Sequence, residues 1–244
     1  MSFPCPVAFT LLTPEKRTGR EILDLTPEAY TPDELQESLA DIRMVNRYLG
    51  DRRALLKQLS AKMGEVSEFS LLDIATGSAD LPIAIADWAR KAGLKASITG
   101  VDMNPRTVDL ARKQTAGHAE ITLEVADALR LRFPDKSFDF VLCSKTAHHF
   151  TEAENVHLIQ EMRRIARRGY IVMDLQRSWI AYALIYLLTR LLARNRVTRN
   201  DGPLSVLRAF TQPELAALAE KAGSSRFTIT REHFWLLVLS GDAG

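Results

Sequence analysis

The sequence LLDIATGSAD, residues 71–80, decides the fold of this chain. An apolar run ends at Asp73, a loop around Gly77 follows, and a helix-forming segment begins directly after it. This order is typical of nucleotide-binding loops, which use glycine where the backbone turns or approaches a ligand. Two such positions hold Ala75 and Ala79, and alanine fits there if its φ angle stays negative. The stretch predicts a ligand-binding loop at the carboxyl end of a first strand.

The alternation of strand and helix continues along the chain. Strands are expected at 69–75, 96–102, 120–127, 137–144 and 170–174, and helices at 81–93, 105–114 and 151–169. Capping boxes, in which a threonine is followed three residues later by a glutamate, mark helix starts at Thr31, Thr151 and Thr211. Residues 226–240 predict one or two closing strands. The pattern predicts an α/β fold with a doubly wound, mostly parallel sheet of seven strands and helices on both faces.

Two segments fall outside this alternation. Residues 1–60 are expected to form an N-terminal arm and a helical extension, and residues 61–244 the main domain. A strongly apolar helical stretch interrupts the main domain at about 178–209, with a loop expected at 198–205. We interpret this stretch as a helical insertion after the fifth strand and not as a second domain.

The composition narrows the functional classes. The chain has 244 residues, of which 46% are hydrophobic, and its net charge of +2 gives only weak support for a nucleic-acid partner. Two distant cysteines, Cys5 and Cys143, indicate a reducing compartment and not a disulfide framework. The N-terminus does not resemble a signal peptide, and the most apolar stretch, 179–188, is shorter than the ~20 residues of a membrane span. A cytoplasmic location is therefore expected.

The acidic ends of the loop limit its ligand. In a dinucleotide fingerprint the three glycine positions would be Ala75, Gly77 and Asp80, and Asp80 would repel the pyrophosphate at the helix N-terminus. No P-loop sequence is present. S-adenosylmethionine has no phosphate and carries a sulfonium and an ammonium group, so acidic side chains complement it. Asp102 and Asp127 follow the second and third strands, where they can accept hydrogen bonds from the ribose hydroxyls and the adenine amino group.

The segments LLDIATGSAD, ITGVD, VADAL, SFDFVLCS and MRRIARRG resemble the successive motifs of class I S-adenosylmethionine-dependent methyltransferases over residues 65–175. The similarity is greatest to the quinone-biosynthesis type and to small-molecule methyltransferases of bacterial secondary metabolism. It implies a Rossmann-like fold, with S-adenosyl-L-methionine as cofactor and S-adenosyl-L-homocysteine as product. The cofactor-binding residues that it implies are Asp73, Ala75, Gly77, Ala79, Asp102, Met103, Asp127, Ala128 and Ser144. Only the central glycine of the usual D-x-G-x-G-x-G is present, and the usual R-P-G-G turn reads RRGY at 167–170.

A hydroxyl acceptor requires a group that takes its proton. His148 and His149 follow the fourth strand, where methyltransferases of this fold place the acceptor. We expect one of them to be the base, with a preference for His148, and the alternative is that both are structural. No metal is expected, because no third ligand stands at a suitable spacing from the pair.

Residues after the fifth strand are candidates for acceptor contacts. Asp174 and Arg177 come first, although Asp174 is also suited to cap the next helix. In methyltransferases of this class extra helices at this place cover the acceptor, and the candidates here are Trp179, Tyr182, Ile185, Tyr186 and Leu188. The N-terminal helix, which folds over the cofactor in related enzymes, adds Arg43, Asn46 and Arg47 or presents them to solvent. The side chains of the insertion suit a small apolar acceptor of aromatic, phenolic, quinol or polyketide-like character.

The expected function is thus methyl transfer to a small apolar acceptor, most readily at oxygen. Arginines at 190, 194, 196 and 199 follow the apolar stretch, so the 178–196 helix is also a candidate for peripheral membrane contact or for a homodimer interface, and the chain is expected to be a monomer or a homodimer. An RNA or protein methyltransferase is a second hypothesis, disfavoured by the absence of a base-reading motif. A non-catalytic cofactor-binding or scaffold protein is a third, and Asp80 opposes a NAD-linked oxidoreductase.

Overall fold

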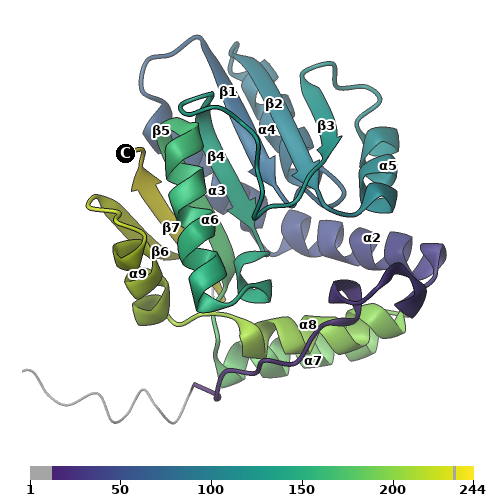
Figure 1. Cartoon of the computed structure of the whole chain (residues 1–244). Coiled ribbons are helices and arrows are strands. Elements are labelled where there is room, and N and C mark those ends of the chain that lie inside the picture. Colours follow the sequence, from purple (N-terminus) through teal and green to yellow (C-terminus); the bar gives the residue numbers. More distant parts are fainter. Residues whose placement is uncertain (1–12, 233–234) are drawn as a thin grey trace, which may run out of the picture.

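A computed structural model describes residues 13–232 and 235–244, and its centre is a seven-stranded sheet (Figure 1). The strands are β1 (Glu68–Ile74), β2 (Lys95–Asp102), β3 (Ile121–Val125), β4 (Phe138–Ser144), β5 (Ala166–Leu175), β6 (Phe227–Glu232) and β7 (Leu236–Asp242). The helices are α2 (Pro32–Tyr48), α3 (Asp51–Met63), α4 (Asp80–Lys91), α5 (Pro105–Gln114), α6 (Glu152–Ile165), α7 (Trp179–Leu192), α8 (Arg196–Arg208) and α9 (Gln212–Lys221). Short 3-10 helices are η1 (Ile22–Asp24), η2 (Pro27–Ala29) and η3 (Ala147–His149). Cys5 lies outside the described residues.

The order of the strands is β3-β2-β1-β4-β5-β7-β6. Neighbouring strands pair in parallel from β3 through β5, and β7 runs antiparallel to both β5 and β6. The predicted mostly parallel, Rossmann-like sheet of seven strands is confirmed. Because the chain reverses its direction of winding between β1 and β4, the carboxyl ends of these two strands border a crevice where ligands of such sheets bind.

Both faces of the sheet are buried, which explains the near-continuous apolar runs of its central strands. Leu72 and Val141 point to the face covered by α6 and α9, while Leu71 and Leu142 point to the face covered by α3 and α4. All four side chains are fully buried, and burial of each contributes about 1.5–3 kcal/mol. The sheet therefore gives the loops at its carboxyl edge a rigid base.

Helix termini follow the capping signals of the sequence. Thr31, Thr151 and Thr211 each accept a hydrogen bond from the backbone of the glutamate three residues later, so all three predicted capping boxes are confirmed. Helix α3 was not predicted, because charged residues interrupt its apolar pattern. Its Leu55 and Leu59 are nevertheless fully buried among the side chains under the sheet, which is tertiary stabilisation that local sequence does not show.

The loop expected at 198–205 is wrong, because these residues lie within α8. Gly202 and Pro203 suggested a turn, but here they belong to a helix packed closely against α7. A Cβ atom at Gly202 would lie 3.0 Å from Thr189 Cγ2 and 3.4 Å from Ile185 Cγ2, so the glycine permits the close approach of the two helices. Asn195 caps the helix by accepting a hydrogen bond from the Val197 backbone N–H (2.7 Å).

The condition under which alanine fits at positions 75 and 79, a negative φ angle, is not met. Their φ angles are 56° and 57°, in the left-handed region that glycine adopts without strain. Each costs about 1–2 kcal/mol relative to the right-handed conformation. Strand β2 and a bond within the loop hold it in this shape, since the Thr76 N–H donates to the Val101 carbonyl of β2 (2.8 Å) and the Ala79 N–H to the Thr76 carbonyl of the loop (3.0 Å). The alanines therefore reproduce the backbone of a glycine loop at an energetic cost.

Candidate active site

A cavity of about 460 Å³ lies between the carboxyl edge of the sheet and a helical cover. The cover consists of η1, α2, α7 and α8, which gather at one end of the sheet (Figure 1). On the sheet side the cavity is lined by the loop after β1 and by residues that follow β4. The lining residues are spread along the sequence from Glu21 to Ser205, and only the topology brings them together.

Several of the predicted ligand-binding residues line this cavity. Asp73, Ala75, Gly77 and Ser144 do so directly. Ala79 is fully buried at the start of α4 and shapes the loop from behind. Gly77 has a φ angle of 55°, and only Leu39 of α2 comes within 4 Å of the position of an added Cβ. The loop thus presents backbone, with little side-chain cover, to the cavity.

The other predicted ligand-binding residues lie further along the sheet edge, beyond the cavity lining. Asp102 ends β2 and accepts hydrogen bonds from the backbone N–H groups of Gly77 (3.1 Å) and Asn104 (3.0 Å). Met103 and Asp127 are exposed, and Asp127 accepts from the Leu129 N–H (2.9 Å), while Ala128 is buried. Asp102 therefore lies at the end of β2, as predicted, and its carboxylate also holds the loop after β1 in place.

Two buried acids that line the cavity, Asp73 and Asp80, and the half-buried Asp102 behind the loop give this side its electrostatic character. Burial raises the pKa of Asp73 to about 7, although Thr76 donates a hydrogen bond to its carboxylate (2.7 Å). Burial likewise raises the pKa of Asp80 and of Asp102. A carboxyl group whose pKa is raised by desolvation gains from a nearby cation, so this side of the cavity fits a positively charged ligand.

The sequence reasoning missed a polar brace beside these acids. The Asn46 amide donates to both carboxylate oxygens of Asp80 (3.3 and 3.2 Å), and Lys145 donates to the Asn46 carbonyl oxygen (2.6 Å). Lys145 also forms an ion pair with the buried Asp51 of α3. Asn46 was identified as a candidate, whereas Asp51 and Lys145 were not, because their partners are distant in sequence. The brace joins α2 and α3 to the ends of β1 and β4.

Two serine hydroxyls complete the loop side. Ser78 and Ser144 line the cavity, and the Oγ atoms of both are buried without a hydrogen-bond partner among the described residues. Buried hydroxyls in proteins are normally hydrogen-bonded, so these atoms are suited to bind a polar ligand. The buried carboxylates can accept hydrogen bonds from an ammonium group, and the free hydroxyls and the Gly77 backbone can bind a carboxylate. Together these polar groups fit the amino-acid part of S-adenosylmethionine.

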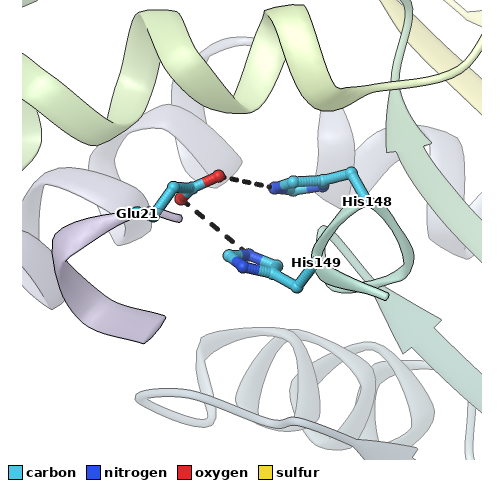
Figure 2. Close-up of side chains that lie close together, drawn as sticks. All are labelled: Glu21, His148 and His149. Atoms are coloured by element: carbon cyan, nitrogen blue, oxygen red, sulfur yellow. Dashed lines mark ion pairs between the residues drawn. The ribbon is translucent and has the colours of Figure 1, made fainter. Parts of the chain in front are cut away.

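The predicted histidine pair faces the cavity together with Glu21, as Figure 2 shows. The His148 Nδ1 lies 2.7 Å from Asp174 Oδ1, and the His149 Nδ1 lies 2.5 Å from Asp24 Oδ1. The centroids of the two rings lie 4.2 Å apart, and the ring planes are tilted by 33°. Glu21 and Asp24 belong to the N-terminal arm and were not predicted, since nothing in the local sequence indicates that this arm reaches β4.

The surroundings of the two histidines differ. Burial lowers the pKa of His148, but the carboxylates of Asp174 and Glu21 outweigh this effect and raise the pKa to about 10. His148 is therefore an imidazolium at neutral pH and has no lone pair to accept a proton. The His149 side chain is 23% exposed, against 2% for His148, so His149 is the more accessible of the two.

The structure places most of the predicted acceptor residues outside the cavity lining. Asp174 is fully buried behind His148 and does not cap α7, which begins at Ser178. The Arg177 guanidinium is also buried and donates to the carbonyl oxygens of Pro14 and Ala209 and to Glu214. It braces the chain around α9 and does not point at the cavity.

Helix α7 meets the cavity with its aliphatic face. Ile185 and Leu188 line the cavity as expected, joined by Leu192. Trp179, Tyr182 and Tyr186 contact one another along another face of α7, with ring centroids 5.8 and 6.0 Å apart. The sequence did not reveal this rotation, because α7 is apolar on nearly every side. Within the described chain no helix is long and apolar enough to cross a membrane.

The sheet and the acidic loop at its carboxyl edge define a class I S-adenosylmethionine-dependent methyltransferase. Residues 71–169 match the family model described as a methyltransferase domain. The chain is 32% identical over 211 residues to the demethylmenaquinone methyltransferase of Deinococcus radiodurans, covering 79% of this chain and 85% of that protein. It is 31% identical to the demethylmenaquinone methyltransferase of Lactobacillus johnsonii over 48% of this chain and 46% of that protein. The chain belongs to the class I S-adenosylmethionine-dependent methyltransferases, of the quinone-biosynthesis type.

Solved structures share the fold at low sequence identity. A methyltransferase from Aquifex aeolicus aligns with a TM-score of 0.61 and 17% identity, over 88% of this chain and all of that one. The magnesium protoporphyrin IX methyltransferase of Synechocystis with bound S-adenosylhomocysteine aligns with a TM-score of 0.56 and 16% identity, over 80% of this chain and 84% of that one. These similarities concern the architecture alone.

Proposed function

We propose that this enzyme transfers the methyl group of S-adenosylmethionine to a hydroxyl oxygen of a small apolar aromatic acceptor, such as a phenol or a quinol. The observation that carries the proposal is a cavity that runs from the acidic loop to His149 between apolar walls. The wall residues are Leu23, Leu39, Ile42, Leu175, Ile185, Leu188 and Leu192. Apolar walls with a few convergent polar groups are typical of sites for small hydrophobic ligands.

The residues around the cavity suit distinct tasks. The cofactor supplies an electrophilic methyl group on a positively charged sulfur. Asp73 and Ser78 would hold its amino-acid part and Asp102 its ribose, while the brace from Asn46 to Lys145 keeps α2 over the loop. His149, oriented by Asp24, would accept the proton of the acceptor hydroxyl. Methyl transfer otherwise needs alignment and exclusion of water, which the helical cover provides.

The relatives support an apolar acceptor. Those from Deinococcus radiodurans and Lactobacillus johnsonii carry the name demethylmenaquinone methyltransferase, and a structural neighbour is named for magnesium protoporphyrin IX. Both names denote ring compounds. The proton acceptor at His149 is the feature of this chain that favours transfer to oxygen.

An acceptor screen tests the proposal. The purified chain is incubated with S-adenosylmethionine and a series of alkylated phenols and hydroquinones, and products are analysed by mass spectrometry and NMR. We expect O-methyl products and an equal amount of S-adenosylhomocysteine. Cofactor binding without any product would favour a scaffold role, C-methyl products would refute transfer to oxygen, and methylation of added RNA or protein would refute the small-molecule assignment.

We further propose that α7 docks on a membrane from which a lipid-soluble acceptor enters. Its inner face lines the cavity, and its outer face exposes Ile180, Leu187 and Leu191. Arg190 and Arg194 are exposed beside this face and complement anionic headgroups. Exposed apolar side chains next to basic ones are typical of a helix lying in the membrane interface.

Vesicle sedimentation tests this docking. We expect the wild type to sediment with anionic vesicles and the double variant Leu187→Glu, Leu191→Glu to remain in the supernatant. Val125→Glu, which changes an equally exposed apolar side chain on β3, is the matched control and should sediment like the wild type. Equal sedimentation of all three proteins would refute docking through α7, and a wild-type dimer that the double variant abolishes would assign this face to self-association.

A further inference from the structure

Two imidazoles and one carboxylate converge at the inner end of the cavity (Figure 2). The His148 Nε2 lies 3.4 Å from Glu21 Oε1, and the His149 Nε2 lies 3.9 Å from Glu21 Oε2. One ligand atom from each residue lies within 4.8 Å of the other two. Metal bonds of about 2.0–2.2 Å to nitrogen and oxygen separate neighbouring ligand atoms by roughly 3–4 Å, so a metal ion fits among the three after small side-chain movements.

The convergent atoms lie within ion-pair distance of one another, and Glu21 also of Arg208, but two of them lack a hydrogen-bond partner in the described chain. The His148 Nε2 and the Glu21 Oε1 are buried and form no hydrogen bond with the described residues. The Glu21 and His148 side chains are only 4% and 2% exposed. Native proteins rarely leave buried polar atoms without a hydrogen bond, because such an atom loses its hydrogen bond to water on burial. Both atoms are aimed at the same point.

The opposite nitrogen of each ring is already oriented. The His148 Nδ1 is hydrogen-bonded to Asp174 and the His149 Nδ1 to Asp24. A metal ion that displaces the second proton of the His148 imidazolium would leave each ring with its proton on Nδ1 and its Nε2 lone pair on the ion. A carboxylate behind a histidine is the usual arrangement around metal-binding histidines, where it fixes the tautomer and the ring plane. Here both rings have this support from different segments of the chain.

The charges around the two rings have a negative sum, which favours binding of a divalent cation. Glu21, Asp24 and Asp174 supply three negative charges around the two rings. Arg208 of α8 supplies one positive charge, since its guanidinium forms ion pairs with Asp24 and Glu21. A doubly charged ion with two neutral imidazoles would make this group electrically neutral.

We propose that Glu21, His148 and His149 form a binding site for one divalent transition-metal ion with the ligand preference of Zn²⁺. Two imidazole nitrogens and one carboxylate oxygen suit borderline ions of this kind and are poor ligands for Mg²⁺. Three protein ligands leave a coordination position on the cavity side, where an acceptor oxygen or water can bind.

The site also has a structural consequence. Glu21 stands on the N-terminal arm, which α8 holds through hydrogen bonds from the Ile22 and Leu23 N–H groups to Asp201 (2.8 and 3.1 Å). A bound ion would tie this arm to the residues that follow β4. Because His149 would then donate its Nε2 lone pair to the ion, metal binding and proton acceptance by His149 are alternative states of one cluster.

Titration of the metal-stripped full chain with Zn²⁺, without cofactor or acceptor, tests the site separately from the proposed function. We expect one equivalent to bind, a rise in Tm of about 5 °C at a hundredfold excess over Kd, and no such response to Mg²⁺. His149→Ala and Glu21→Gln should each weaken binding at least tenfold. His157→Ala, which removes an exposed histidine on α6, is the matched control and should bind like the wild type.

Co²⁺ provides a second readout that does not depend on the variants. Bound among two imidazoles and a carboxylate, it should give the visible absorption of a low-symmetry site, and Zn²⁺ should displace it. Absence of stoichiometric binding by the wild type would overturn the proposal, as would unchanged binding by both variants when circular dichroism shows them folded. Either result would leave the acceptor screen to decide the proposed function independently.

Discussion

Replacing His149 by alanine is expected to lower turnover on hydroxyl acceptors by about 10²- to 10⁴-fold, the range of a lost general base. Cofactor affinity should not change, because His149 lies on the acceptor side of the cavity and not at the loop after β1. The defect should narrow as the pH approaches ~10, where a phenolic acceptor ionises without help. Rates measured from pH 6 to 10 in buffer with a chelator, so that no metal contributes, check this expectation.

His157→Ala is the matched control, since it removes a histidine far from the cavity lining and should leave the rates unchanged. Wild-type turnover by the His149 variant would remove the need for a base at this position. A loss that is equally large at every pH would indicate a role in positioning the acceptor. His148 is the weaker candidate because its raised pKa, about 10, keeps it protonated at neutral pH.

The change Asp102→Ala is expected to weaken cofactor binding by about ten- to a hundredfold, as when hydrogen bonds to a charged group are lost. Two effects contribute: the ribose would lose its acceptor, and the N–H of Gly77 would lose the carboxylate that fixes the loop. Calorimetric titration with S-adenosylmethionine and S-adenosylhomocysteine, with NADH as a negative control, measures the change.

Two further variants separate these effects. Asp102→Asn retains one oxygen for the backbone N–H groups and should lose less affinity than the alanine variant. Asp109→Ala removes an exposed acid on α5 that pairs with Arg112 and should bind the cofactor normally. Unchanged affinity in Asp102→Ala would contradict the assignment of Asp102 to the ribose, whatever the stability of the variant.

Much of the sheet and of the loop side of the cavity followed from sequence patterns. The ends of β1, β2 and β4 at Ile74, Asp102 and Ser144 were predictable to within about one residue because apolar runs and capping residues act locally. The conformations of Ala75 and Ala79 were not, since a hydrogen bond to β2 and another within the loop hold them against the preference of the residue. Local patterns thus indicated where the loop lies and missed what shapes it.

The acceptor side of the cavity could not be predicted in the same way, because contacts between segments distant in sequence form it. Glu21 and His148 are separated by more than a hundred residues and meet only because α8 holds the N-terminal arm. The third ligand that we propose for the histidine pair, Glu21, is therefore distant from the pair in sequence. Helix α7 was recognised, yet its orientation was not, because a helix that is apolar all round gives no sign of which face is buried.

The left-handed alanines of the loop after β1 have a consequence for how this enzyme fails on heating. A loop with two strained backbone conformations has a lower free energy of local opening than the sheet beneath it. It therefore belongs to the least stable parts of the molecule. Local opening at Ala75 and Ala79 would expose the Gly77 N–H to hydrogen exchange while the central strands stay protected. The cofactor-binding loop would then lose its structure before the whole protein unfolds, and bound S-adenosylmethionine would delay this local opening.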